Sequence, residues 1–491
     1  STLSPSSAAS DVYKRQIVSW LFALAVSFVS CDDWLDKTPK DRLYPDVYFK
    51  TEDELRLFTN QFYNNLVPSA VDIYSESSDL IVKSDLMLEM SGQRIIPDEG
   101  NGWNFTALRD INFYLQYSHN CTEVNARNRY DGVARFFRAY FYFEKVKRYG
   151  DIPWYDKALD SDDPELYKAR DSREFVMQKM LEDLDFAIAN LPKTKNAYVL
   201  TRWTALALKS RVCLFEGTFR KYHGLEDCEK YLNACVSASE TFMNESGYTL
   251  YKSGSTPYRD LFASINLQAD EVIFGRDYEA SLSVLHNVQN YENSTTMGRP
   301  GMNKKIVNSY LMADGSRFTD KAGYETMTFD QECQNRDPRL AQTIRTPGYT
   351  RIGSTKKEAP NLAYTMTGYH LIKYSMTANY DEYNKSCNDI PLFRTAEVYL
   401  NFAEAKAELG TLKQADINKS IKLLRDRVGM TNLDMELANS KPDPYLMSAA
   451  TGYPNVKGAN QGVILEIRRE RTIELAMEGL SLIHISEPTR L

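Results

Sequence analysis

The sequence has 491 residues, a formal net charge of −7 and an apolar fraction of 43%. This composition is typical of a globular protein long enough to form two or more hydrophobic cores, and a mean hydropathy of −0.47 excludes a protein that crosses a membrane many times. The excess of acidic residues argues against a nucleic-acid partner, because nucleic-acid binders carry basic surfaces.

An apolar stretch at residues 17–30 ends at Cys31 and is followed by two aspartates. It is shorter than the roughly 20 residues that a membrane span requires, but it suits the core of an export signal. A small residue followed by a cysteine is similar to a bacterial lipoprotein signal, in which the cysteine carries the lipid. We therefore predict a signal peptide at 17–30 and lipid attachment at Cys31. The alternative is a buried apolar strand or helix that contains a free thiol.

Both ends of the chain resemble translated adapter sequence, and we interpret residues 1–16 and 481–491 as non-native tails. On this interpretation the basic pair Lys14–Arg15 imitates the start of a signal peptide by accident. The alternative is a natural signal start, and the lipoprotein prediction holds in either case.

Helical periodicity dominates residues 31–246. Thr51 and Glu54 form a capping box that opens the first predicted helix. Further helices are predicted over 103–116, 131–149, 171–191, 201–224 and 225–244. Consecutive antiparallel helices with short links are typical of a helical-hairpin solenoid. A clean 34-residue period is absent, so any tetratricopeptide-like repeats are degenerate.

The composition changes at residues 247–390, where Gly, Thr, Asn, Tyr and Pro become more frequent and helical periodicity is lost. One strand is predicted at 270–278. Helices return over 389–410, 414–428 and 462–479, within a last unit at 391–480. We therefore predict a mostly α fold: tetratricopeptide-like helical pairs, forming an α-solenoid, with an irregular loop-rich insertion that contains short strands.

The sequence carries no recognisable catalytic motif. The five histidines are scattered, and HExxH, GxSxG and phosphate-loop patterns are absent. The acidic run at 160–163 could bind a hard cation, but a solvated loop is the simpler interpretation. Carboxylate pairs of a glycosidase need not be adjacent in sequence, so the sequence alone leaves that alternative open. We predict a binding protein that is not an enzyme and has no cofactor or metal.

Several segments together resemble the SusD/RagB family of outer-membrane nutrient-binding lipoproteins of Bacteroidetes. These segments are SCDDWLD, RFFRAYFYFEKVKRYGDIP, TRWTALALKSRVCLFEGTFRKY, NRDPRL, DIPLFRTAEVYLNFAEAKAELG and RRERTIELAMEG. The resemblance implies tetratricopeptide-like helices that frame a ligand-binding region. It also implies a surface-exposed protein, lipid-anchored in the outer membrane, that delivers a glycan to a SusC-like TonB-dependent transporter. Because family members continue past Gly479, we expect the C-terminal portion to be truncated.

The ligand site is predicted in loops that the helical scaffold carries. In related glycan binders the loop before the helix that begins near residue 103 contributes contacts, and a sugar needs an aromatic surface with polar neighbours. The alternative for Trp103 is a buried residue at its helix start, whereas Trp34, Trp154 and Trp203 are expected to pack in the core. The predicted ligand-binding residues are Asp72, Tyr74, Arg94, Trp103, Asn104, Tyr291 and Asn293.

Two classes of function remain open. The first is a surface lipoprotein that captures a glycan, or, as in some family members, a peptide. The second is a structural adaptor whose helical solenoid holds a protein partner and no small ligand. Stabilisation by oligosaccharides would distinguish them, because a ligand that binds the native state alone raises its stability.

Overall fold

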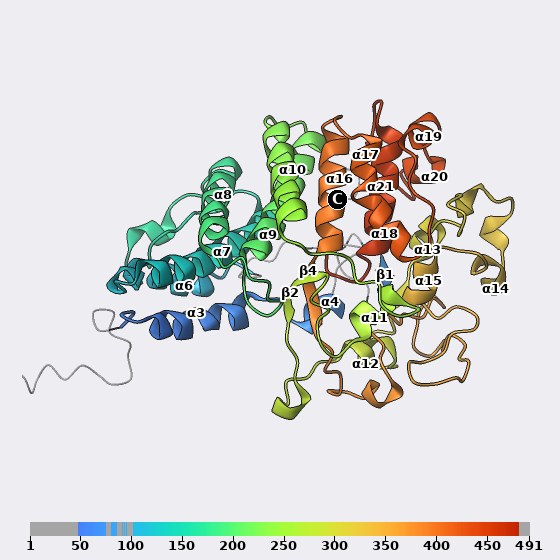
Figure 1. The fold of residues 1–491 in the computed structure, drawn as a ribbon, viewed down its shortest axis with the longest axis horizontal. Coiled ribbons are helices and arrows are strands. Elements are labelled where there is room, and N and C mark those ends of the chain that lie inside the picture. Colours follow the sequence, from blue (N-terminus) through green and yellow to red (C-terminus); the bar gives the residue numbers. More distant parts are fainter. Residues whose placement is uncertain are drawn as a thin grey trace, which may run out of the picture.

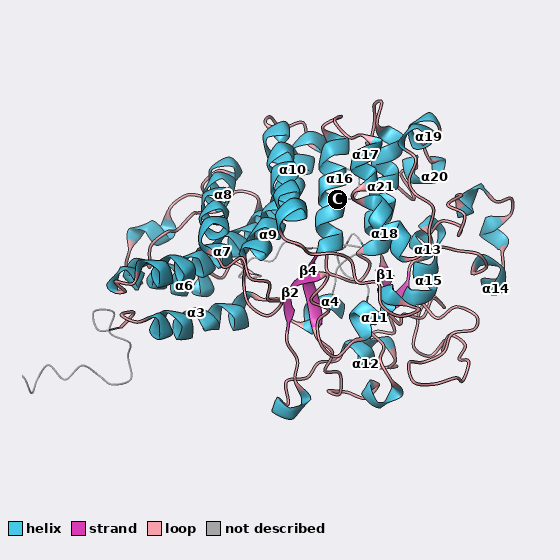
Figure 2. Ribbon diagram, in the orientation of Figure 1, coloured by secondary structure: helices cyan, strands magenta, loops and turns pink. Residues whose placement is uncertain are grey.

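A computed structural model of the chain describes residues 48–74, 80–85, 91, 93, 95 and 102–480. The predictions for Cys31, for Arg94 and for both tails lie outside the described residues, and of Tyr74 the backbone alone is described. The described chain is mostly helical with a few short strands, which confirms the predicted fold class (Figure 2). In this part of the chain, no helix has both the length and the apolar character needed to cross a membrane.

A row of long helices crosses the molecule from the N-terminal to the C-terminal unit (Figure 1). The helices pack in the order α7, α8, α9, α10, α16 and α21, and each contacts the next. Helices α3 and α6 pack against α7. These helices are α3 (Glu52–Leu66), α6 (Thr106–Tyr117), α7 (Val124–Tyr149), α8 (Arg173–Asn190), α9 (Arg202–Tyr222), α10 (Cys228–Glu245), α16 (Thr395–Glu408) and α21 (Gln461–Glu474).

Local sequence signals fix several of these helix ends. The predicted capping box at Thr51 and Glu54 is present, and it satisfies backbone N–H groups that lack helical partners. The start of α8 differs from the prediction: Ser172, and not Asp171, accepts from the Phe175 backbone N–H. Helix α7 ends where Gly150 takes a positive φ of 68°, a conformation that glycine adopts without strain.

The region between α10 and α16 is built from short elements and loops, as predicted (Figure 1). Its predicted strand is β2, which is shorter than expected and pairs antiparallel with β4 through an irregular register. A second small sheet joins β1 to β3. The short elements of this region are α11 (Pro257–Ala263), β2 (Val272–Arg276), α12 (Val288–Glu292), β3 (Gly301–Met302), α13 (Lys304–Ser309), α14 (Phe329–Glu332), α15 (Pro338–Thr343) and β4 (Ile390–Arg394). Two more short elements, α4 (Ala70–Tyr74) and β1 (Ile81–Val82), lie between α3 and α6 in the chain.

In the C-terminal unit, the structure differs from two of the predicted helices. The single helix expected over 414–428 is two short helices, α17 and α18, because Ser420 leaves helical geometry with φ −136° and ψ −89°. The helix expected over 462–479 ends earlier, at Glu474, and Met477 then adopts a positive φ of 63°. The remaining helices are α17 (Gln414–Asn418), α18 (Ile421–Arg427), α19 (Met435–Ser440) and α20 (Pro444–Met447).

Helix α21 carries an unusual number of buried charges. All of its residues from Gly462 to Glu474 are buried, including the uninterrupted run of charged side chains at positions 468–471. Glu474 accepts from Arg339, Arg394 and Arg427, which come from three different segments. Because burying an unpaired charge is very costly, these ion pairs hold the insertion and the C-terminal helices in one arrangement.

Candidate functional site

Trp103 lies in the turn that leads into α6, and its side chain is 38% exposed. Its ring makes edge contacts with Phe105 and Tyr149, at centroid distances of 5.4 and 5.0 Å. The Arg170 guanidinium lies over the ring, 5.0 Å from its centroid. Trp103 is therefore not a fully buried residue at the start of α6: its ring is held in place and remains partly open to solvent.

The turn before α6 is tied to the end of α7. Asn104 is exposed, and its side-chain oxygen accepts from the Thr106 backbone N–H at 2.8 Å. Lys145 of α7 donates to the Gly102 carbonyl and lies above the Phe141 ring, 4.9 Å from its centroid. Burial first, and then the neighbouring Arg148, lower the pKa of Lys145. The position of Trp103 is thus set by the packing of α6 on α7.

A short 3-10 helix, η3 (Pro164–Tyr167), precedes Arg170 in the chain and carries an exposed tyrosine that was not among the predicted site residues. Tyr167 is 85% exposed and stands three residues before Arg170. The Tyr155 hydroxyl anchors η3 by donating to the Leu166 carbonyl at 3.1 Å, and its ring meets Phe105 edge-on at 5.7 Å. We call Trp103, Asn104, Tyr149 and Arg170 the Trp103 surface.

The acidic run at 160–163 lies just before η3 and is engaged in local contacts. Asp163 accepts from the Glu165 backbone N–H at 2.9 Å and so caps η3. Asp160 and Arg109 form an exposed ion pair at 3.9 Å. Among the described residues, no group of three or more His, Cys, Asp or Glu is arranged to hold a metal ion.

Four other predicted site residues, Asp72, Tyr74, Tyr291 and Asn293, lie in or next to α4 and α12, which pack against each other. Asp72 of α4 is exposed, and its carboxylate accepts from the Ser69 backbone N–H at 2.6 Å. Tyr291 is 5% and Asn293 is 6% exposed. The Asn293 side-chain oxygen accepts from Arg345 and Arg351 at 2.8 and 3.2 Å. In contrast to the prediction of direct ligand contact, Tyr291 and Asn293 are buried, and Asn293 is held by its bonds to the two arginines.

A buried polar cluster continues from α12 into the insertion. Glu292 accepts from the Tyr374 backbone N–H at 3.1 Å and from the Ser375 hydroxyl at 2.7 Å. Burial raises the pKa of Glu292 to about 7. Burial likewise lowers the pKa of His370 to about 3, and the His370 ring bonds the Glu292 carbonyl. These groups are held inside the fold and do not face solvent.

Two family models match the chain on either side of α10. The one described as "Starch-binding associating with outer membrane" matches residues 93–202, and the one described as "SusD family" matches residues 261–481. The chain belongs to the SusD/RagB family. The first matched segment contains the whole Trp103 surface, and the second contains most of the loop-rich insertion and the ion-paired helix α21.

Relatives and solved structures agree with this assignment. Two SusD-like proteins of Formosa agariphila are 25% and 22% identical to this SusD-family chain, covering 93% and 95% of it and 87% and 90% of the relatives. A SusD-like protein from Bacteroides fragilis has a TM-score of 0.69 at 22% identity, covering 91% of this chain and 88% of that one. A SusD-like carbohydrate binding protein from the same species has a TM-score of 0.66 at 18% identity, with coverages of 89% and 86%. At these identities the structures establish a shared fold.

Proposed function

We propose that this protein captures a glycan at the outer membrane and delivers it to a SusC-like TonB-dependent transporter. Membership of the SusD/RagB family supports this function, as does the description of one matching family model, which names starch binding and the outer membrane. A structural relative is described as a carbohydrate binding protein. We assign the protein a binding role and no catalytic one.

The observation that carries the proposal is the partly exposed ring of Trp103. A sugar presents C–H groups on one face, and these pack against an aromatic ring, while its hydroxyls need polar partners at the edge. Edge contacts with Phe105 and Tyr149 fix the ring before a ligand arrives, and such preorganisation reduces the entropy lost on binding. The Arg170 guanidinium lies over the ring, and Asn104 is the next residue in the chain, so both are candidates to bond sugar hydroxyls.

The α4 segment is a second contributor in this proposal. Asp72 is exposed there, and Tyr74 stands at the end of the same short helix. Burial raises the pKa of Tyr140 of α7, and the charge of the nearby Asp72 carboxylate adds to this rise. We propose that Asp72 and Tyr74, together with Arg94, contact a glycan that extends beyond the Trp103 surface.

The test compares wild type with Trp103→Ala. We expect oligosaccharides identified on a glycan array to bind the variant at least tenfold more weakly by calorimetry, a loss of about 1.4 kcal/mol, with the melting temperature retained. Tyr383→Ala is the matched control, because Tyr383 is an exposed aromatic residue (67%) on another loop; its affinity should be unchanged. A lowered melting temperature with full affinity would make Trp103 a structural residue. A wild-type protein that binds no oligosaccharide would favour the adaptor function.

A further inference from the structure

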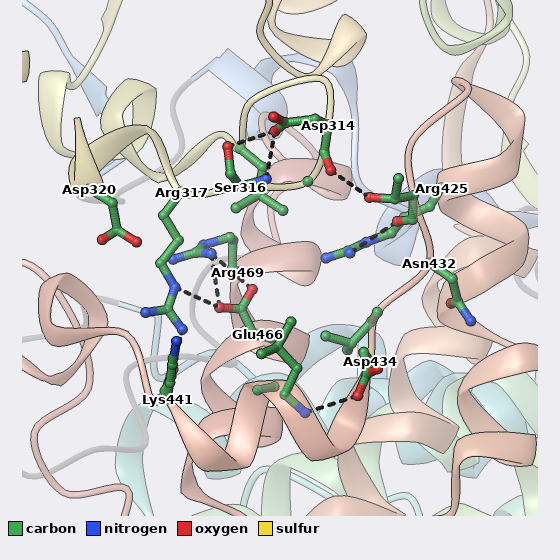
Figure 3. A pocket seen from close by; sticks show the side chains of 16 residues that line it. Asp314, Ser316, Arg317, Asp320, Arg425, Asn432, Asp434, Lys441, Glu466 and Arg469 are labelled. Atoms are coloured by element: carbon green, nitrogen blue, oxygen red, sulfur yellow. Dashed lines mark hydrogen bonds and ion pairs between the residues drawn. The ribbon is translucent and has the colours of Figure 1, made fainter.

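A pocket of about 400 Å³, lined by charged and apolar side chains, lies between the loop at 314–320 and helices α18, α19 and α21 (Figure 3). These three helices stand at the opposite side of the molecule from α6 and α7, which carry the Trp103 surface (Figure 1). The pocket is therefore separate from that surface. Its volume falls in the range of about 300–1,000 Å³ that is usual for small-molecule sites.

The charges that line the pocket balance one another. Four basic side chains, from Arg317, Arg425, Lys441 and Arg469, face four carboxylates, from Asp314, Asp320, Asp434 and Glu466. Several are already paired inside the protein: Arg469 donates to Glu466 at 2.8 Å and to Asp443 of the loop before α20. A cation would meet the arginines and an anion would meet the carboxylates, so this lining disfavours either kind of ion.

Arg425 supplies the observation that points to a ligand. It is 3% exposed, its Nε donates to Glu470 at 2.9 Å, and its Nη1 donates to the Thr431 carbonyl at 3.2 Å. Its Nη2 has no hydrogen-bond partner among the described residues. Figure 3 shows the guanidinium reaching into the pocket from the α18 side, opposite Arg317 and Arg469. Leaving a buried donor unpaired costs about 1–3 kcal/mol. Nη2 is shielded from solvent in this structure, so a ligand that accepts from it would recover this loss once Arg425 turns further into the pocket.

We infer that this pocket is a second carbohydrate site, which holds one neutral sugar ring through its hydroxyl groups. A hydroxyl can accept from Arg425 and donate to a carboxylate at the same time, which matches a lining that holds both donors and acceptors. Leu311, Leu433 and Leu437 provide apolar contacts for C–H groups, and Leu437 is 59% exposed. The ligand class is that of the proposed function, on which this inference rests, but the site is a different one.

The test uses the full chain carrying Trp103→Ala, so that the first surface does not contribute. Saturation-transfer NMR is recorded with glucose, galactose, mannose and xylose, and with glucuronate and glucosamine as anionic and cationic sugars. We expect at least one neutral sugar to bind, and to bind more tightly than both charged sugars. Arg425→Lys keeps a cation beside Glu470 but removes Nη2, and we expect it to weaken binding at least tenfold.

A second variant keeps the inference testable if Arg425→Lys fails to fold. Leu437→Trp adds bulk at an exposed position of the lining and leaves the buried ion pairs intact; it should also weaken binding at least tenfold. Leu282→Trp, at another exposed position, is the matched control and should bind normally. The inference is overturned if no neutral sugar binds, if a charged sugar binds better, or if the folded pocket variants bind as the parent does. Such a failure would leave the effect of Trp103→Ala on oligosaccharide affinity untouched, so the two proposals fail separately.

Discussion

Glu292 is a fully buried carboxyl group whose pKa of about 7 lies above its ordinary value of 4.5, chiefly because of burial. Between these two pH values the folded protein binds the proton more tightly than the unfolded chain does. The contribution of Glu292 to the free energy of unfolding is therefore complete below about pH 4.5 and is lost as the pH rises through 7. A shift of this size corresponds to about 3 kcal/mol.

We expect Glu292→Gln to remove this part of the pH dependence. The glutamine oxygen can accept from the Tyr374 N–H, and its amide can donate to the Ser375 hydroxyl. Urea unfolding at pH 5 and pH 8 should show the stability of the variant rising relative to wild type as the pH increases. His286 and His370 have lowered pKa values and lose stability as pH falls through 6.5, but both proteins contain them, so they cancel in the comparison. Parallel curves for the two proteins would contradict the prediction.

The contact between α9 and α10 depends on a glycine. A Cβ at Gly217 would lie 2.7 Å from the Leu232 side chain and 3.1 Å from its backbone nitrogen. Gly217→Ala should therefore push the helices apart and lower the free energy of unfolding by about 1–3 kcal/mol. Gly132→Ala on α7 is the matched control, since its Cβ would meet Leu191 at 3.4 Å. At position 132, replacing glycine by alanine should stabilise the helix by up to about 1 kcal/mol. Equal losses in the two variants, by chemical denaturation, would show that the α9–α10 spacing is adaptable.

The buried charges of α21 are expected to matter far more than charges on exposed helices. Burial opposes ionisation of Glu474, but Arg427, Arg394 and Arg339 outweigh it and hold its pKa well below its usual range. Glu474→Gln leaves those arginines short of a counter-charge, so we expect a loss of about 3–5 kcal/mol. The same substitution at Glu182, in an exposed pair with Lys179, should cost about 1 kcal/mol or less. Urea denaturation of both variants measures the difference, and similar losses would mean that the buried network does not stabilise the fold.

At the scale of elements, periodicity predicted the long helices well because each buries one continuous face. It failed at 414–428, where the break at Ser420 follows from a local bond: the Ser420 hydroxyl donates to the Asp416 carbonyl. It also gave no sign that the polar residues of α21 are buried. Their partners Arg339, Arg394 and Arg427 lie far away in sequence, so the ionic core exists only in the folded arrangement.

At the scale of the whole molecule, the candidate site was partly predictable. Trp103 stood out as a tryptophan at a loop–helix junction, and the structure leaves it partly exposed, while Trp154 and Trp203 are buried as expected. The contact of Arg170 with the Trp103 ring was missed, because it joins residues that are far apart in the sequence. The pocket was not predictable, because its lining comes from 311–320, 425–441 and 466–469, which only tertiary packing brings together.

The predicted lipid anchor at Cys31 would determine where the whole molecule is located. If residues 17–30 form a lipoprotein signal, the Cys31 thiol carries the lipid, and more than one acyl chain is needed because a single chain binds membranes weakly. We expect Cys31→Ala to move the protein from the outer-membrane fraction to the soluble or inner-membrane fractions. Cys228→Ala is the control, since Cys228 is a free cysteine elsewhere in the chain, and its variant should fractionate as wild type does. Metabolic labelling with a palmitate analogue should mark wild type and Cys228→Ala but not Cys31→Ala. Outer-membrane retention of Cys31→Ala would show that protein contacts, for instance with the transporter, hold the protein there without a lipid at this position.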